Sequence, residues 1–590
     1  MKLQHNSTTG LSLAVIFSLF VCLITNTAYA QSSLKTETVV ANNGAITTAV
    51  AANYDSKVKA DKKVVEEFAS GVYQLRGWGI ANTIAVDAKD GFIIIDTGDS
   101  LKAASEMRTA LEKEIGAKVK VAAILYTHHH YVYGTSIWLD DGTKIIAHEN
   151  LDSDMKADQG LSVYAGNVAV RGLTQFGFMN PMQGADAFPN SLGSTIEKLT
   201  QESGYLPATE TIKDGVTVNR TIAGEAIEIA ECKIDVQNSI CFYFPDRSTL
   251  VTNFMASPSI FNLYSLRGDI YRDPLTYIAA SDWALSKSVK YVLDIHSAGT
   301  RGKKASRLAL EESRDQMQII HDQTLRLISK GYDARRVAEN IYIPVSILQD
   351  RETFGQVESH VKQVYNAKIG WMGNDIYDIN PLSVNEETRR TLELMGGKAA
   401  VLKSAQAAVE KTDFENWKWA IYLSSKLLEL DKQDQDARNI RAAASRKLGQ
   451  HTTSANARGW YITEALAMEN KLTIGPQAIN RDAIRKNFGK ASKEKILAAE
   501  IDSAVNYIRF LIDPKLAEGK RFGFELTIID QDYQATVEVR NGVIAITPND
   551  MDKSKKSLIK LTSEQWADFL ISGDSEHSSL NKLNKLLDRG

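Results

Sequence analysis

The stretch "ILYTHHHYVYG", residues 124–134, leads from an apolar run directly into three consecutive histidines. In an extended segment successive side chains point to opposite faces, so we expect His128 and His130 on one side and His129 on the other. Two imidazoles on one side of a strand end can hold zinc, or they can be solvated side chains of a polar loop. Val132 and Tyr133 follow and are poor metal ligands, so the stretch by itself indicates at most part of a metal site.

Strand and helix patterns alternate around this stretch. Residues 71–77, 82–98, 120–127 and 143–149 are expected to form strands, and 100–116 a helix. Such alternation, with polar side chains at strand ends, is typical of an α/β layered domain. Asp96 stands at one of these ends, where it could support the histidines from behind or shape a turn.

Length and composition narrow the class of protein. A chain of 590 residues is too long for one core, so about two to four domains are expected. Hydrophobic residues make up 44% and charged residues 24%, which is ordinary for a globular protein. The formal net charge of −3 argues against a nucleic-acid partner, because a phosphate-binding surface needs a basic excess.

The first residues have the pattern of a secretory signal. An apolar run over residues 11–24 is followed by Ala28-Tyr29-Ala30, so we expect a signal peptide over 1–30, cut after Ala30. An uncleaved anchor helix is the alternative. No later apolar run is long enough to span a bilayer, which predicts a periplasmic or secreted protein. The mature chain then keeps Cys232 and Cys241, which could form a bridge between adjacent strands or remain two buried thiols.

The pattern changes near residue 311, where long helical segments begin. Residues 398–449 resemble a pair of antiparallel helices of tetratricopeptide type, and a joint is expected at 454–459. From residue 493 a helix leads into short strands with an Asn541-Gly542 hairpin signal, and a closing helix with Ser563 as its N-cap. A helical domain followed by a small α+β domain is therefore expected.

Several motifs resemble known families. "IIIDTG", a helix, "THHH" and "IIAHE" resemble the metallo-β-lactamase fold, whose ligand motif is Thr-His-x-His-x-Asp-His. Thr127, His128 and His130 fit that motif, whereas Val132 replaces its Asp and Tyr133 its second-site His. Further along, five segments in the same order resemble the alkylsulfatase family: "CFYFP", "FNLYSLRGDIYRDP", "IIHDQTLRLISKGY", "HVKQVYNAKIGWMGND" and "LELMGGKAAVL".

The second resemblance implies a multidomain α/β protein that hydrolyses alkyl sulfate esters with zinc. It implies a metallo-β-lactamase-like αββα sandwich over residues 31–310, an all-α dimerisation domain over 311–457, a linker over 458–492 and a sterol-carrier-like α+β domain over 493–590. The implied partners are a second copy of the chain and an alkyl sulfate or similar amphipathic anion. The C-terminal domain is expected to offer an apolar groove for the alkyl chain.

The resemblance also implies site residues. His128 and His130 match metal ligands, and His296 is the candidate for a last histidine. Counting back from Pro245 of the "CFYFP" segment places Asp235 where the family has a ligand glutamate. Phe254 stands where a bridging glutamate is expected, so we predict one zinc ion, with two as the alternative.

Asn262, Arg267 and Arg272 match residues that hold the sulfate. The predicted function is thus a zinc-dependent alkyl sulfate hydrolase with a reduced one-metal site. The alternatives are a non-catalytic binder of amphipathic anions and a hydrolase of another ester class.

Overall fold

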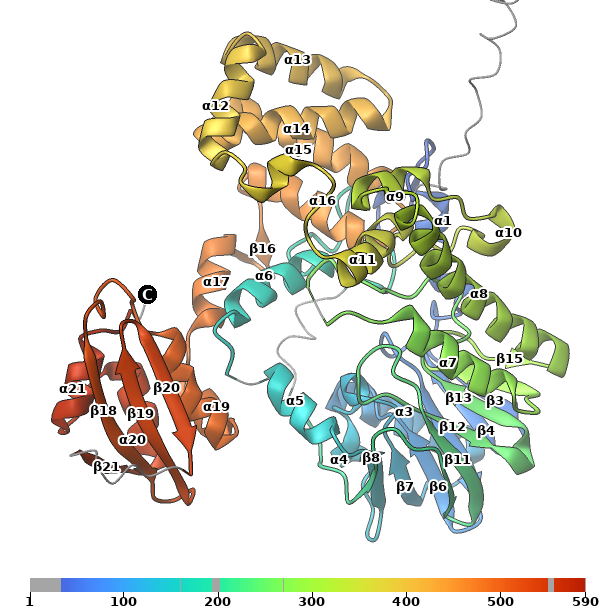
Figure 1. The fold of residues 1–590 in the computed structure, drawn as a ribbon. Helices are drawn as coiled ribbons and strands as arrows, with labels where there is room; N and C mark the ends of the chain where they lie inside the picture. The colour runs from blue at the N-terminus through green and yellow to red at the C-terminus, as the bar shows by residue number, and fades with distance from the viewer. Residues whose placement is uncertain (1–32, 160, 194–201, 269, 550–556, 589–590) are drawn as a thin grey trace, which may run out of the picture.

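The computed structural model describes residues 33–159, 161–193, 202–268, 270–549 and 557–588. The expected signal peptide, residues 1–30, lies outside the described residues. Two sheets form the centre of the first half of the chain (Figure 1). The strands of the first sheet, in spatial order, are β3 (Val64–Ala69), β4 (Val72–Arg76), β5 (Thr83–Ala88), β6 (Gly91–Ile95), β7 (Val121–Leu125), β8 (Lys144–His148) and β9 (Glu210–Ile212). Those of the second are β10 (Val218–Ile222), β11 (Glu225–Glu231), β12 (Ile240–Phe244), β13 (Thr249–Thr252), β14 (Tyr291–Asp294) and β15 (Thr300–Arg301).

The two sheets pack face to face around one apolar core. Ile84 and Ile93 of the first sheet and Ile229 and Phe242 of the second are fully buried in it. Alternate residues of the same strands, such as Ile94, face helices instead, which is why these strands read as continuous apolar runs. The arrangement is the expected αββα sandwich.

Helices cover both outer faces of the sandwich. The helices on the first sheet are α3 (Leu101–Ile115), α4 (Thr135–Trp138) and α5 (Leu151–Gln159). Those on the second are α7 (Pro274–Leu285), α8 (Lys303–Ile328), α9 (Ala334–Asn340), α10 (Val345–Leu348) and α11 (Val357–Ile369). The N-terminal segment, with β1 (Val39–Val40), β2 (Ile46–Thr47), α1 (Ala49–Ala52) and α2 (Tyr54–Lys57), and α6 (Ala165–Gln175) complete this part.

The predicted domain boundary at residue 311 is wrong. It falls inside α8, and residues of α8, α9 and α11 share one core with Cys241, Tyr243 and Leu250 of the second sheet. The change to helical periodicity marks where helices begin, but not which core they face. A separate core begins only with α12.

That second core lies in a helical domain. Its helices are α12 (Val384–Leu394), α13 (Lys398–Glu410), α14 (Phe414–Leu430) and α15 (Gln435–His451). Residues 398–449, predicted as a helix pair, therefore form three helices. Asp413 and Asp434 divide them, because each side chain accepts a backbone N–H bond as an N-cap.

Residues 458–492 are not a linker. They hold most of α16 (Ala455–Met468), the hairpin β16 (Thr473–Ile474) and β17 (Gln477–Ala478), and α17 (Arg481–Gly489). Arg458 is 1% exposed, and its guanidinium donates to the carbonyls of Ile46, Gly449, Ala185 and Ala187. A residue that looks like a surface charge in sequence thus joins α16 to the N-terminal segment.

The C-terminal part is a four-stranded sheet with helices, which stands apart from the sandwich in Figure 1. Its elements are α18 (Lys493–Ala498), α19 (Ile501–Asn506), β18 (Arg521–Ile528), β19 (Tyr533–Arg540), β20 (Val543–Pro548), β21 (Leu558–Leu561), α20 (Ser563–Ser572) and α21 (Ser578–Asn584). The predicted hairpin is confirmed, with positive φ at Asn541 and Gly542. The N-cap of α20 is Thr562, which forms a capping box with Gln565, and Ser563 is the first helical residue.

The structure also bears on the expectations about membrane-spanning segments and about the two cysteines. Among the described residues, none of the helices has the length and apolar character needed to cross a membrane. Cys232 and Cys241 form a disulfide with Cα atoms 5.8 Å apart, which favours the bridge over two thiols. The bridge closes the loop that carries Asp235.

Candidate metal centre

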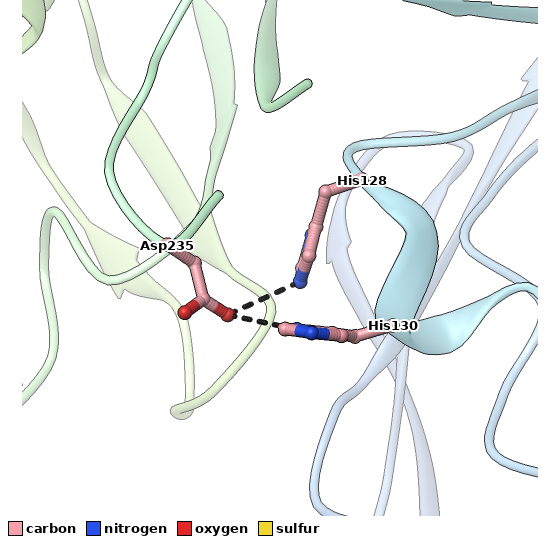
Figure 2. Close-up of side chains that lie close together, drawn as sticks. All are labelled: His128, His130 and Asp235. Atoms are coloured by element: carbon pink, nitrogen blue, oxygen red, sulfur yellow. Dashed lines mark hydrogen bonds and ion pairs between the residues drawn. The ribbon is translucent and has the colours of Figure 1, made fainter. Parts of the chain in front are cut away.

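The three histidines follow β7 at its carboxyl end, and the chain turns there rather than staying extended. His128 is extended, with φ of −170°, and η1 (His129–Tyr131) is a 3₁₀ turn. His128 and His130 nevertheless face the same side, as Figure 2 shows, because both rings reach toward Asp235. His129 is buried on another side, where its Nδ1 lies 2.8 Å from Asn238 Nδ2. His128 and His130 therefore share a side as predicted, but His129 is not on the opposite face of a strand, since its ring centroid lies 4.5 Å from that of His130 within the turn.

Three candidate ligand atoms converge at one point. His128 Nε2 lies 3.3 Å, and His130 Nδ1 3.1 Å, from Asp235 Oδ2 (Figure 2). Potential ligand atoms of these three residues all lie within 4.8 Å of one another. Two histidines and a carboxylate are a common donor set for a catalytic metal with an open position.

Thr127 links His128 to Asp96. Thr127 Oγ1 donates to Asp96 Oδ2 at 2.7 Å and lies 2.9 Å from His128 Nδ1, and Asn253 Nδ2 lies 3.4 Å from the same ring nitrogen. These contacts hold the imidazole by Nδ1 and leave Nε2 directed at Asp235, as a metal ligand requires. Asp96 thus supports His128 from behind, which was one of its two predicted roles.

The electrostatics fit a cation at this point. Burial lowers the pKa of His128 to about 4, so its ring is neutral at neutral pH. Burial alone would raise the pKa of Asp235, but Arg272 and the two histidines outweigh it and hold that pKa well below its ordinary value. His128 Nε2 is buried without a hydrogen-bond partner among the described residues. A neutral orphaned nitrogen beside an ionised carboxylate is what a bound metal ion would satisfy.

Arg272 is the direct partner of Asp235. Its Nη2 lies 2.8 Å from Asp235 Oδ1 and its Nε donates to the Asp235 carbonyl at 2.7 Å. A third contact, at 3.3 Å, goes to the carbonyl of Asn262. These bonds leave Asp235 Oδ2 for the histidines, and they give Arg272 a positioning role that its sequence context did not indicate. Its predicted role toward sulfate stays a prediction.

His296 lies outside the compact group. Its ring stacks on Phe254 with centroids 3.8 Å apart and an interplanar angle of 13°. The ring centroid of Tyr131 lies 5.2 Å from that of His296, edge to face, and His296 Nε2 has no hydrogen-bond partner among the described residues. Burial lowers the pKa of His296 to about 3. An aromatic ring therefore covers the histidine that the sequence suggested for a second metal.

The predicted sulfate residues line the same pocket as His130 and Asp235. Asn262 is 3% exposed, and its Oδ1 has no hydrogen-bond partner among the described residues. Arg267 is half-buried, and α6 fixes its backbone: Gln175 Oε1 accepts from the Arg267 N–H at 2.7 Å, and Arg171 Nε donates to the Arg267 carbonyl at 2.7 Å. Gln175 and Arg171 were missed, because no local pattern shows which distant backbone a side chain reaches.

A second histidine cluster has a different character. His148, Asp214 and Glu231 also bring potential ligand atoms together. Lys233 Nζ, however, lies 2.7 Å from a carboxylate oxygen of both Asp214 and Glu231. An ammonium group already balances the acidic pair, which indicates a structural role for His148.

Comparisons with known proteins agree with this architecture. The alkyl sulfatase dimerisation family matches residues 334–471, and the metallo-beta-lactamase superfamily matches residues 76–131. A linear primary-alkylsulfatase of Pseudomonas sp. is 28% identical over 506 residues, which are 83% of this chain and 92% of that protein.

An (R)-specific secondary-alkylsulfatase of Pseudomonas sp. is 25% identical, over 83% of this chain and 74% of that protein. Among solved structures, the inverting sec-alkylsulfatase Pisa1 from Pseudomonas sp. has a TM-score of 0.73 and 20% identity, covering 95% of this chain and 93% of that one. That likeness shows the fold. In the order of its domains and in these relatives, the chain is similar to the alkylsulfatases.

Proposed function

We propose that the protein hydrolyses alkyl sulfate esters, such as dodecyl sulfate, with one zinc ion held by His128, His130 and Asp235. The observation that carries the proposal is the convergence of His128 Nε2 and His130 Nδ1 on Asp235 Oδ2, at 3.3 and 3.1 Å. The names of the relatives, primary and secondary alkylsulfatases, support the substrate class. Zinc held there would activate the ester and the attacking water as a Lewis acid.

The chain's own residues would bind and orient the ester. Arg267 lines the pocket with a planar fork suited to a tetrahedral oxyanion, and Asn262 adds a neutral polar group beside it. Arg272 fixes the carboxylate of Asp235 through its side chain and its carbonyl, so that Oδ2 stays directed at the histidines. Hydrolysis adds one water and releases an alcohol and a sulfate.

The single-metal stoichiometry follows from the ligands. Val132 is fully buried and apolar, and Phe254 covers His296, so a second zinc would have too few protein ligands. The same losses favour a second candidate, a non-catalytic protein that binds amphipathic anions. Zinc content measured together with dodecyl sulfate hydrolysis separates the two.

The decisive experiment compares two buried histidines. His128→Ala should remove most of the zinc and the hydrolysis together, measured by elemental analysis and sulfate release. His148→Asn is the matched control, since His148 is equally buried but belongs to the cluster that Lys233 balances. Zinc retained in His128→Ala and lost in His148→Asn would move the metal to the other cluster. Two zinc ions per wild-type chain would contradict the single-metal site.

We also propose that the protein is exported to the periplasm or secreted and acts as a homodimer. The disulfide Cys232–Cys241 supports an oxidising compartment. The match to a dimerisation family supports a second copy as partner. Exposed apolar side chains on and before α12, such as Trp371, Ile376 and Leu394, supply a surface that a second copy would cover.

A further inference from the structure

The pocket beside His130 and Asp235 has two kinds of wall. One part is polar and carries the predicted sulfate residues Asn262 and Arg267. Apolar side chains line the rest, and five of them, away from the ring of Phe254, form what we call the tail wall: Val58, Ala60, Phe176, Leu192 and Phe354. A pocket with an anion-binding part and an apolar part suits an amphipathic anion.

The tail wall is built as a small core of its own. Val58 is 4% and Leu192 8% exposed, and they pack with Tyr54 and with Phe354 from beyond α10. The rings of Phe176 and Phe354 lie 6.5 Å apart. Four segments that are remote in sequence thus meet at one side of the pocket.

Hydrogen bonds hold these segments together. Both carboxylate oxygens of Asp55 accept from the Ser191 N–H at 3.0 Å, and the Ser191 hydroxyl donates to Asp55 at 2.5 Å. Asn190 donates to the carbonyl of Ala51 at 2.8 Å. The N-terminal segment and the loop before residue 193 are therefore fixed to each other, so the tail wall is preformed.

The C-terminal domain takes no part in this pocket. Phe354 is the last residue along the described chain that lines it. The sheet of β18–β21 stands apart from the two central sheets in Figure 1. The apolar groove expected of that domain would lie away from the candidate metal ligands.

We propose that the tail wall, and not the C-terminal domain, binds the carbon chain next to the ester and sets the preference for its length. The inference rests on the proposed function for the identity of the anion. Leu192 and Val58 are its specificity-determining residues, because they combine burial in the wall with a place in the pocket lining.

The test uses methanesulfonate, butanesulfonate and octanesulfonate, which keep the anionic head but have no ester to hydrolyse. Calorimetry on the full-length protein gives their affinities. Each methylene that reaches the tail wall should raise affinity about fourfold. Leu192→Ala should weaken octanesulfonate about tenfold and leave methanesulfonate nearly unchanged.

The matched control is Leu173→Ala, since Leu173 is 4% exposed on α6 but faces a core away from the pocket. It should leave the dependence on chain length unchanged, and thermal unfolding of both variants shows whether they fold. The role of the tail wall would be overturned if Leu192→Ala lost equal affinity for the long and the short sulfonate, or lost none for either. It would also be overturned if the wild type bound no sulfonate. Binding as expected with no hydrolysis of any alkyl sulfate would refute the proposed activity and leave the tail wall standing.

Discussion

Replacing Arg272 with Met tests whether this arginine supports Asp235 or holds sulfate. Arg272 and Asp235 are each 9% exposed, and two hydrogen bonds join the guanidinium to Asp235. Removing one partner of a buried ion pair leaves the other charge unpaired, which costs about 3–5 kcal/mol. At roughly 1.4 °C per kcal/mol for a unit of this size, the unfolding midpoint of the metal-free protein should fall by about 4–7 °C.

The assay is a double-mutant cycle in which thermal unfolding of each variant is measured in the presence of a chelator. Arg272→Met, Asp235→Asn and the double variant are compared with the wild type. The double variant should lose less stability than the sum of the two single losses, because it has no unpaired charge. Its unfolding temperature should lie near that of Asp235→Asn. Arg272→Lys should recover only part of the stability, because an ammonium cannot donate the same fork to side chain and carbonyl.

One outcome would refute this reasoning. If Arg272→Met keeps the unfolding temperature of the wild type but no longer binds sulfonates, then Arg272 serves the sulfate and its bonds to Asp235 are incidental. A coupling energy near zero between positions 272 and 235 would lead to the same conclusion.

Three further predictions concern other parts of the molecule. Thiol titration of the mature, denatured and unreduced protein should find no free thiol, and two free thiols would reject the bridge. Replacing Cys232 and Cys241 with Ala should lower the free energy of unfolding by about 2–3 kcal/mol. Ile376→Asp combined with Leu394→Asp should give monomers in light scattering, because these side chains are 80% and 90% exposed, and an unchanged dimer would exclude this surface. Burial raises the pKa of Glu352 from 4.5 to about 7, so the folded protein binds a proton there more tightly than the unfolded chain does. The free energy of unfolding therefore falls as the pH rises through that interval. Glu352→Gln should therefore match the wild type at low pH and exceed it in unfolding temperature above neutral pH, and a parallel pH dependence of the two proteins would contradict this.

The sandwich could be predicted from sequence because its signals are local. Strands buried on both faces read as apolar runs, and the histidines stand directly after one of them. The boundary at residue 311 failed because membership of a core is a long-range property. The buried face of α8 contacts the second sheet, and its own sequence carries the same helical pattern whichever core it joins.

In the candidate metal centre, too, local features could be predicted from sequence and long-range contacts could not. His128 and His130 could be paired by their spacing, but Asp235 lies in an irregular loop and was located only by its distance from a family motif. Gln175 and Arg171 hold a backbone more than ninety residues away, at positions that read only as part of an amphipathic helix. Contacts from a side chain to a distant backbone leave no periodic trace in sequence, so such supporting residues need a structure.

The residues that depart from the family's metal motif show what occupies the place of the missing ligands. Sequence shows only the differences, at Val132, Tyr133 and Phe254. In the structure Phe254 has a φ of 60°, a conformation that is costly for a bulky side chain and persists only where its surroundings impose it. Stacking on His296 and a hydrogen bond from the Tyr277 hydroxyl to the Phe254 carbonyl supply that support. The position is thus filled by a packed aromatic pair, and restoring a carboxylate at 254 alone would break this packing without returning the other ligands.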